Sequence, residues 1–401
     1  MSEKQKTYAK LVFIILLIFM YQFYGIFPVS DQISQIICFI LSITFFLICW
    51  NKRIKTKFYF SSTLVFIGIM ATSGLIMTFF NIGFVFNAFI KYINVLGIMT
   101  LALSVYVFVT EEWFFTLKSI ICVSTIGNFI MLLQVIYFNY SGFFFLKVPY
   151  GFRNGPRFSL GGDILPFVVL LLLSLVITKK HKLTPIFAVN IISGLAAILY
   201  AIQTRQVFIS LIISVFVMLF FSIISKKNIV LLLILSTCIF FICLFGGSSY
   251  INHYINSFTE STGDYAGSNS VRQGELNWYL YTVIPMHFPL GIGLYDNVQW
   301  GEIPYLAHGP DGSFTTTDIG TIGDIVNFGI FALLTIFSII RKMIVISIRN
   351  PLLIGIATFI IYCQLTTLSY LVLSNSMERF ITLMFIIGLM TAIDRIEREG
   401  I

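Results

Sequence analysis

Long runs of hydrophobic residues, separated by short polar breaks, repeat along almost the whole chain. A helix that crosses the hydrocarbon core of a bilayer needs roughly 20 apolar residues. The period-two alternation of a membrane β-barrel is absent. The pattern therefore predicts an all-α polytopic membrane protein, one integral membrane domain over residues 1–401, with about 12 transmembrane helices at 11–27, 32–50, 59–80, 88–110, 116–138, 163–178, 184–203, 206–225, 228–246, 320–340, 352–373 and 378–394.

Composition narrows the class of protein further. Hydrophobic residues make up 58% of the chain and charged residues only 10%, whereas soluble domains carry about a quarter charged residues. The six cysteines lie inside apolar runs without a CxxC pair, so we expect neither a disulfide framework nor a zinc site. The net charge of +8 comes from cations scattered between the runs, which argues against a nucleic-acid partner.

The positions of the cations predict the orientation of the chain, because cytoplasmic loops are enriched in Lys and Arg. Placing both termini in the cytoplasm puts most cations on that side. Two long outer segments remain, 139–162 and 247–319, and we expect the second, between the ninth and tenth spans, to form a cap of short helices. Seven cations do not fit this rule and are candidates for a functional site: Lys91, Lys147, Arg153, Arg157, Arg205, Arg272 and Arg379.

Three of these arginines adjoin helix-breaking sequence. Arg153 and Arg157 lie among glycines and a proline, where backbone N–H groups and guanidinium groups suit a phosphate; the alternative is a loop anchored to lipid headgroups. Arg205 follows the polar pair Gln203-Thr204 between two spans. Its guanidinium can fork onto phosphate oxygens, and the alternative is a helix-end anchor.

The second outer segment holds further candidates. Arg272 and Glu275 are three residues apart, so on a helix they share a face, and simple pairing is the alternative to function. Asp318 is a candidate general base at the start of the tenth span, with helix N-capping as its alternative. Asp311, Asp318 and Asp324 form no DxD pair, so we expect no metal. Aromatic side chains suit stacking on sugars, or else belong to the membrane-interface belt: Trp278, Tyr295 and Trp300.

These motifs resemble those of the O-antigen polymerase and O-antigen ligase superfamily of bacterial cell-envelope glycan assembly. The resemblance rests on Arg272 with Trp278, the segment 289–293 (Pro-Leu-Gly-Ile-Gly), and Asp318 followed eleven residues later by Gly329. Thr204-Arg205 resembles the first arginine motif of that family. The twelve-span plan with one large late outer loop fits as well, so the resemblance covers essentially the whole chain.

The resemblance implies a metal-independent glycosyltransferase of the bacterial cytoplasmic membrane that needs no cofactor. Its substrate would be an undecaprenyl-pyrophosphate-linked oligosaccharide on the outer face, and its partners the bilayer, a chain-length regulator and a flippase. Arg205 and Arg272, helped by Arg157 and Arg153, would bind the pyrophosphate. Ligases carry a histidine where this chain has Asp318, so either Asp318 or His308 would be the base.

Three functions are compatible with this pattern. A polymerase of O-antigen or capsule repeats is the leading hypothesis, and a ligase that transfers glycan to another acceptor is the second. The third is a lipid-linked oligosaccharide flippase or transporter. Transporters often show internal repeats and paired broken helices, which this sequence lacks.

Overall fold

The computed structural model describes residues 1–23, 31–50, 58–143, 150–152, 156–158, 162–178, 180–224, 268–294, 303–310, 312–366, 369–371 and 377–399. Regular structure in these ranges is helical apart from one small hairpin. Its strands, β1 (Tyr150–Phe152) and β2 (Pro156–Phe158), pair antiparallel with Gly151 opposite Arg157. The all-α prediction is confirmed for the described residues apart from this short hairpin, where a glycine and a proline break the helical pattern.

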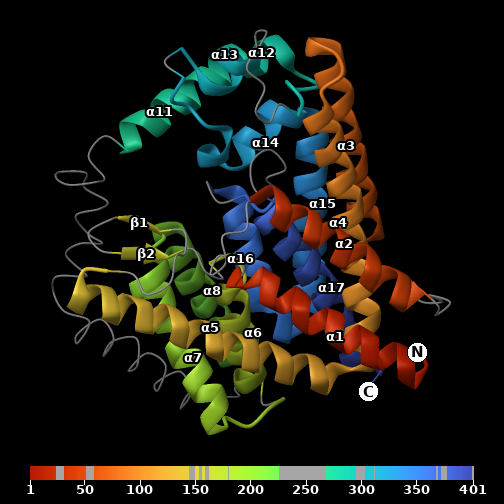
Figure 1. Cartoon of the computed structure of the whole chain (residues 1–401), viewed down its shortest axis with the longest axis vertical. Helices are drawn as coiled ribbons and strands as arrows, with labels where there is room; N and C mark the ends of the chain where they lie inside the picture. Colours follow the sequence, from red (N-terminus) through yellow and green to blue (C-terminus); the bar gives the residue numbers. More distant parts are fainter. Residues whose placement is uncertain are drawn as a thin grey trace.

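One half of the bundle is built from α1 (Glu3–Met20), α2 (Asp31–Trp50), α3 (Ser61–Ile82), α4 (Phe86–Glu111), α15 (Ile330–Arg349) and α17 (Glu378–Glu399). Helix α4 packs against α2, α3 and α17, and α15 lies along α3 (Figure 1). A cluster of buried phenylalanines joins four of the helices. The ring of Phe108 lies 4.9 Å from that of Phe13 and 5.5 Å from that of Phe45, and Phe385 stacks on Phe13 at 6.0 Å.

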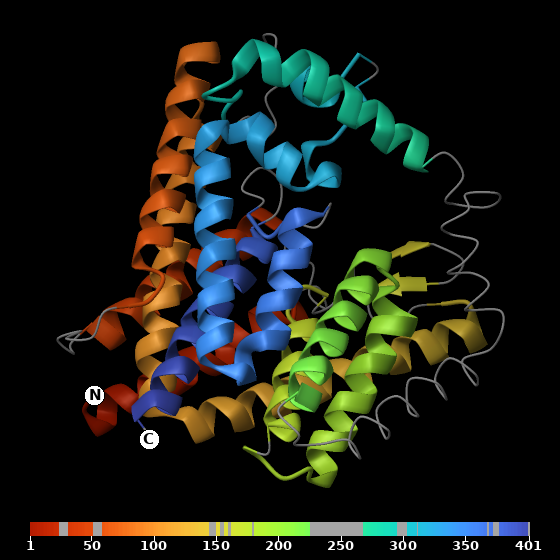
Figure 2. The same ribbon diagram turned by 180° about the vertical axis from the view of Figure 1, so that it is seen from behind.

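The other half contains α5 (Trp113–Ser141), α6 (Leu165–Ile177), α7 (Pro185–Ala197) with the π-helix η2 (Ile198–Ile202), and α8 (Arg205–Ile224). The short helix η5 (Pro351–Leu353) leads into α16 (Ile354–Leu365), which packs against α6 and α8. Figure 2 shows α15 and α16 in the centre, between the α3–α4 pair and this group. Buried amides tie α5 to α7: Asn190 Nδ2 donates to Ser124 Oγ at 2.5 Å, and Asn128 Nδ2 to Ser193 Oγ at 3.1 Å.

Short helices cover one end of the molecule. They are α11 (Ser268–Trp278), the π-helix η3 (Tyr279–Val283), α12 (Ile284–His287), α13 (Ile303–His308), the 3-10 helix η4 (Thr316–Ile319) and α14 (Thr321–Phe328). We call the described residues 268–294 and 303–319 the cap. The cap lies at the opposite end of the long axis from both chain termini (Figure 1).

Among the described residues, five helices are long and apolar enough to cross a membrane, which is the pattern of a membrane protein. They are α3, α4, α5, the run Pro185–Ile202 and α15. Shorter apolar helices cover Ile36–Trp50, Leu165–Ile177, Gln206–Phe221 and Pro351–Leu365. The predicted span 228–246 lies outside the described residues. Helix α4 is continuous although Lys91 and Asn94 interrupt its apolar run, and both side chains are buried.

The predicted span 320–340 is wrong, because the helix is broken at Gly329. Gly329 has φ +57°, a conformation that side chains rarely adopt, and it separates α14 from α15. The span-length helix therefore starts only at Ile330. The predicted span 352–373 is also shorter in the structure, since α16 ends at Leu365.

The end that carries both termini is held by charged side chains. The N-terminal amine lies 3.1 Å from Glu111 Oε2, and Lys10 Nζ lies 3.0 Å from Glu112 Oε2. Arg395 donates to the hydroxyl of Tyr106 at 3.0 Å. These contacts join α1 and α17 to the α4–α5 junction, so the first and last helices of the chain are fastened at the same end.

Candidate functional site

Aromatic side chains join the two main helices of the cap. The Tyr279 hydroxyl donates to the carbonyl oxygen of Ala307 at 2.5 Å, and Trp278 Nε1 donates to that of Leu306 at 3.2 Å. The Trp278 ring also meets Tyr305 edge-on, with centroids 5.1 Å apart. Trp278, a predicted sugar-binding residue, thus uses its only polar atom inside the cap and leaves only ring surface for a ligand.

The strap that links the cap to the bundle is the Pro289–Leu294 segment, which contains the Pro-Leu-Gly-Ile-Gly motif. Backbone N–H groups of Ile292 and Gly293 donate to the carbonyl oxygens of Val326 and Asn327, each at 2.9 Å. Ile330 N–H donates to Pro289 at 2.7 Å. Both glycines have positive φ, and a Cβ on Gly291 would lie 2.5 Å from the Asn327 carbonyl oxygen. The motif glycines therefore permit a close backbone approach.

Thr78 of α3 fastens the other side of the strap. Its hydroxyl accepts the Leu294 N–H at 2.7 Å and lies 2.7 Å from the Leu294 carbonyl oxygen. Asn81 Nδ2 donates to the carbonyl oxygen of Ile292 at 3.0 Å. The strap thus joins α3 to the α14–α15 junction, and the position of the cap depends on both.

Glu275 of α11 is the most deeply buried acid of the cap, at 1% exposure. Its Oε1 accepts the Thr315 N–H at 3.1 Å, and its Oε2 has no hydrogen-bond partner. Burial raises the pKa of the Glu275 carboxyl; the Thr315 N–H opposes this shift, Asp318 adds to it, and Arg272 opposes it. Arg272 and Asp318 therefore each lie close enough to Glu275 to act on its carboxyl. Among the described residues no ion pair joins Arg272 to Glu275, so the simple pairing considered from their spacing is not formed.

His308 and Asp318, the two candidate bases, both belong to the cap. Nδ1 of His308 lies 3.1 Å from the carbonyl oxygen of Phe314, and a carbonyl only accepts, so Nδ1 carries the proton. The lone pair is then on Nε2, as a general base requires. Asp318 is an exposed residue of η4, and its side chain does not cap a helix: the N-cap of α14 is Gly320. The N-cap interpretation of Asp318 is therefore wrong.

The remaining predicted arginines are described only by their backbone or not at all. Arg205 is the first residue of α8, after a chain reversal in which Gln203 has φ +50°. Arg157 lies in β2, which packs against η2 and so approaches the same reversal. Their side chains lie outside what the structure describes, as do Arg153, Tyr295 and Trp300.

A buried polar cluster around Asp324 was only partly foreseen. The Asp324 side chain, 3% exposed, accepts the Ser369 hydroxyl at 2.5 Å and lies 3.5 Å from Gln364 Nε2. Nearby, Arg379 Nε lies 3.5 Å from Asp163 Oδ1. The sequence singled out Arg379 as a misplaced cation, but no local signal links it to Asp163. Asp324 lies in the first turn of α14, directly after η4, so this turn joins the cap to the cluster.

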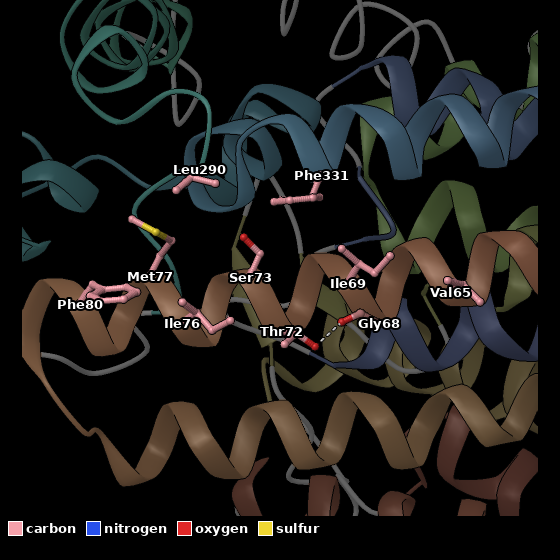
Figure 3. Close-up of a pocket in the computed structure, with 10 residues that line it drawn as sticks. All are labelled: Val65, Gly68, Ile69, Thr72, Ser73, Ile76, Met77, Phe80, Leu290 and Phe331. Atoms are coloured by element: carbon pink, nitrogen blue, oxygen red, sulfur yellow. Dashed lines mark hydrogen bonds between the residues drawn. The ribbon is translucent and has the colours of Figure 1, made fainter.

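An apolar groove of about 570 Å³ runs along α3, beneath Leu290 and Phe331 (Figure 3). Thr72 and Ser73 are its only polar side chains, and the Thr72 hydroxyl is bonded to the Gly68 carbonyl at 2.7 Å. This lining suits a hydrocarbon chain and offers no charge to a phosphate. Within the described ranges, no three His, Cys, Asp or Glu side chains gather as metal ligands.

Comparison with known protein families and with characterised proteins finds no match to this chain. The family resemblance therefore rests on the motif residues themselves.

Proposed function

We propose that this chain is a polymerase of O-antigen or capsular polysaccharide. It joins undecaprenyl-pyrophosphate-linked oligosaccharides on the outer face of the bacterial cytoplasmic membrane. In this proposal the chain crosses the membrane about twelve times, both termini are cytoplasmic and the cap is outside. The observation that carries the proposal is that Asp318 and Arg272, two motif residues of the resemblance, both lie close to Glu275 in one cap, although Asp318 is distant from Arg272 in the sequence.

The chemistry assigns a role to each group. A hydroxyl of the acceptor sugar attacks the anomeric carbon of the donor, the bond from that carbon to the pyrophosphate oxygen breaks, and undecaprenyl pyrophosphate leaves. Arg272 and Arg205, with Arg157 and Arg153, stabilise the charge on the leaving group, so that no metal is needed. Asp318 or His308 takes the hydroxyl proton. Trp278, Tyr295 and Trp300 offer ring faces to the sugars.

Deleting the gene and separating the surface glycan on a gel tests the reaction class. A polymerase defect leaves a single repeat on the acceptor, whereas a ligase or flippase defect removes the glycan altogether. Complementation of the deletion strain with Arg272→Lys tests whether Arg272 binds the pyrophosphate through two nitrogens. Lysine keeps the positive charge but cannot donate to two oxygens in the forked geometry of arginine. The matched control is Arg341→Lys, since Arg341 is an exposed residue of α15 away from the cap. If the Arg272→Lys variant still makes surface glycan of full length, the bidentate role of Arg272 is contradicted.

The base is identified by a second pair of variants. Asp318→Asn and His308→Gln keep the size of each side chain and remove its ability to take a proton. We expect the variant of the true base to leave single repeats while the other retains polymer. If both retain full-length polymer, neither residue is the base.

A further inference from the structure

Three other helices begin close to the C-terminal end of α16. Cys363 Sγ lies 3.3 Å from Ser210 Oγ, so the end of α16 packs beside the start of α8. Tyr370, shortly after α16, donates to the Asp163 carbonyl at 3.2 Å, just before α6 begins at Leu165. Arg379 in the first turn of α17 lies beside Asp163. The starts of α6, α8 and α17 therefore all lie near the same end of α16.

Arg379 is the cation at this point, and most of its hydrogen-bonding capacity is unused. Among the described residues its one ion pair is long, with Nε 3.5 Å from Asp163 Oδ1. Nη1 and Nη2 make no hydrogen bond to any residue that the structure describes. The side chains of Arg379 and Asp163 are 28% and 22% exposed, although the flanking Met377, Phe380 and Ile164 are buried. A partly exposed guanidinium whose terminal nitrogens make no hydrogen bond within the described residues is suited to bind an oxyanion.

The surroundings define where that oxyanion would sit. Cys363 contacts Ser210, and Ser210 lies only five residues after Arg205 on α8, about 7–8 Å along the helix axis. Tyr370, shortly after α16, contacts Asp163, and Arg379 lies beside Asp163, so Arg379 and the start of α8 lie near the same end of α16.

We propose that Arg379, held in orientation by Asp163, is a further phosphate-binding residue that grips the pyrophosphate of the lipid-linked substrate from the bundle side. The ion pair with Asp163 fixes Nε, and Nη1 and Nη2 take two oxygens of the phosphate. The identity of the ligand rests on the proposed function; the presence of an oxyanion site does not. A bilayer phospholipid headgroup carries the same chemistry, so the experiment separates the two sources.

The test uses the full chain in phosphatidylcholine nanodiscs, titrated with geranylgeranyl pyrophosphate. We expect Arg379→Gln to weaken binding about ten-fold or more, as expected for loss of a charge-assisted bidentate contact. Arg379→Lys should lie between that variant and wild type. Arg341→Gln, the control at an exposed position of α15, should bind as wild type does. Geranylgeraniol, which lacks the pyrophosphate, should bind all variants equally.

Wild-type affinity of Arg379→Gln for geranylgeranyl pyrophosphate overturns the proposal. If that variant does not fold, wild-type affinity of Arg379→Lys overturns it instead. A second preparation uses nanodiscs that also contain phosphatidylglycerol, and native mass spectrometry counts the phosphatidylglycerol bound to each variant. If Arg379→Gln loses bound phosphatidylglycerol but keeps its affinity for geranylgeranyl pyrophosphate, the residue binds a bilayer lipid and the proposal is overturned. The proposed function fails separately: if gene deletion leaves glycan length unchanged, the polymerase assignment is wrong whatever the nanodiscs show.

Discussion

Replacing Gly329 by alanine tests how the cap is attached to the membrane helices. Gly329 has φ +57° and ψ −134°, a combination that only glycine adopts readily. A Cβ at this position would overlap the carbonyl oxygen of Pro289 in the strap. That oxygen also accepts the Ile330 N–H at 2.7 Å, so the overlap cannot be relieved without moving the strap and weakening this bond.

The expected cost follows from these two effects. Forcing alanine into the backbone conformation costs about 1–3 kcal/mol. The strained or lost backbone hydrogen bond adds about 1 kcal/mol. We therefore expect Gly329→Ala to destabilise the protein by about 2–4 kcal/mol. Gly142 is a matched control, since its φ is +72° but a Cβ there would meet nothing within 4 Å. Gly142→Ala should cost only about 1–2 kcal/mol.

Thermal unfolding in detergent compares the two variants, and limited proteolysis of the cap localises the effect. Gly329→Ala should unfold at a clearly lower temperature than Gly142→Ala, and its cap should be cleaved faster under conditions where the rest of the protein stays folded. Equal unfolding temperatures and equal cleavage rates for the two variants would refute the close approach of the strap to the α14–α15 junction.

Three further predictions concern buried polar groups. Burial raises the pKa of Glu275, so its ionisation opposes folding: stability is greatest below the unfolded pKa and falls as the pH rises through the folded pKa. Glu275→Gln should therefore flatten the dependence of unfolding temperature on pH above 4.5, and an unchanged slope would contradict the burial of this acid. Thr78→Val keeps the side-chain shape but removes the shorter of the two acceptors of the Leu294 N–H, leaving only the Gly74 carbonyl at 3.3 Å, so we expect a loss of about 0.5–1.5 kcal/mol and faster cap proteolysis, with Thr72→Val as a control outside the strap. Asp324→Ala removes the acceptor of the Ser369 hydroxyl and should also cost about 1–3 kcal/mol; an unchanged unfolding temperature would show that the cluster adds no stability.

The predicted helices agree with the structure where the hydrophobic run was uninterrupted. The run 59–80 corresponds to α3 (Ser61–Ile82), and 116–138 lies within α5 (Trp113–Ser141). The polar pair Gln203-Thr204 also marks a true break between helices. The hydrophobic run 320–340 predicted one continuous helix, because the residues on both sides of Gly329 are apolar. Only the approach of the strap shows why the helix stops there.

The sequence predicted which polar residues belong to the candidate site, but not which groups they contact. Arg272, Asp318 and His308 stood out as polar groups in an apolar chain, and the structure places all three in the cap. Glu275 was considered as a simple partner of Arg272, whereas its bond goes to the backbone of Thr315. Asp163 attracted no attention, since a carboxylate before an apolar run is common; its significance comes from Arg379, which is far away in the sequence.

The sequence by itself determined that this chain is a helical membrane protein, because the free energy of moving a segment into hydrocarbon depends mainly on the residues of that segment. It also determined which polar residues are costly there and so worth testing. The tertiary structure decided which of them meet: Glu275 with Thr315, Asp324 with Ser369, and Arg379 with Asp163. Those pairings depend on how the helices pack and on where glycines allow two backbone segments to come close. Neither can be read from the residues of one segment alone.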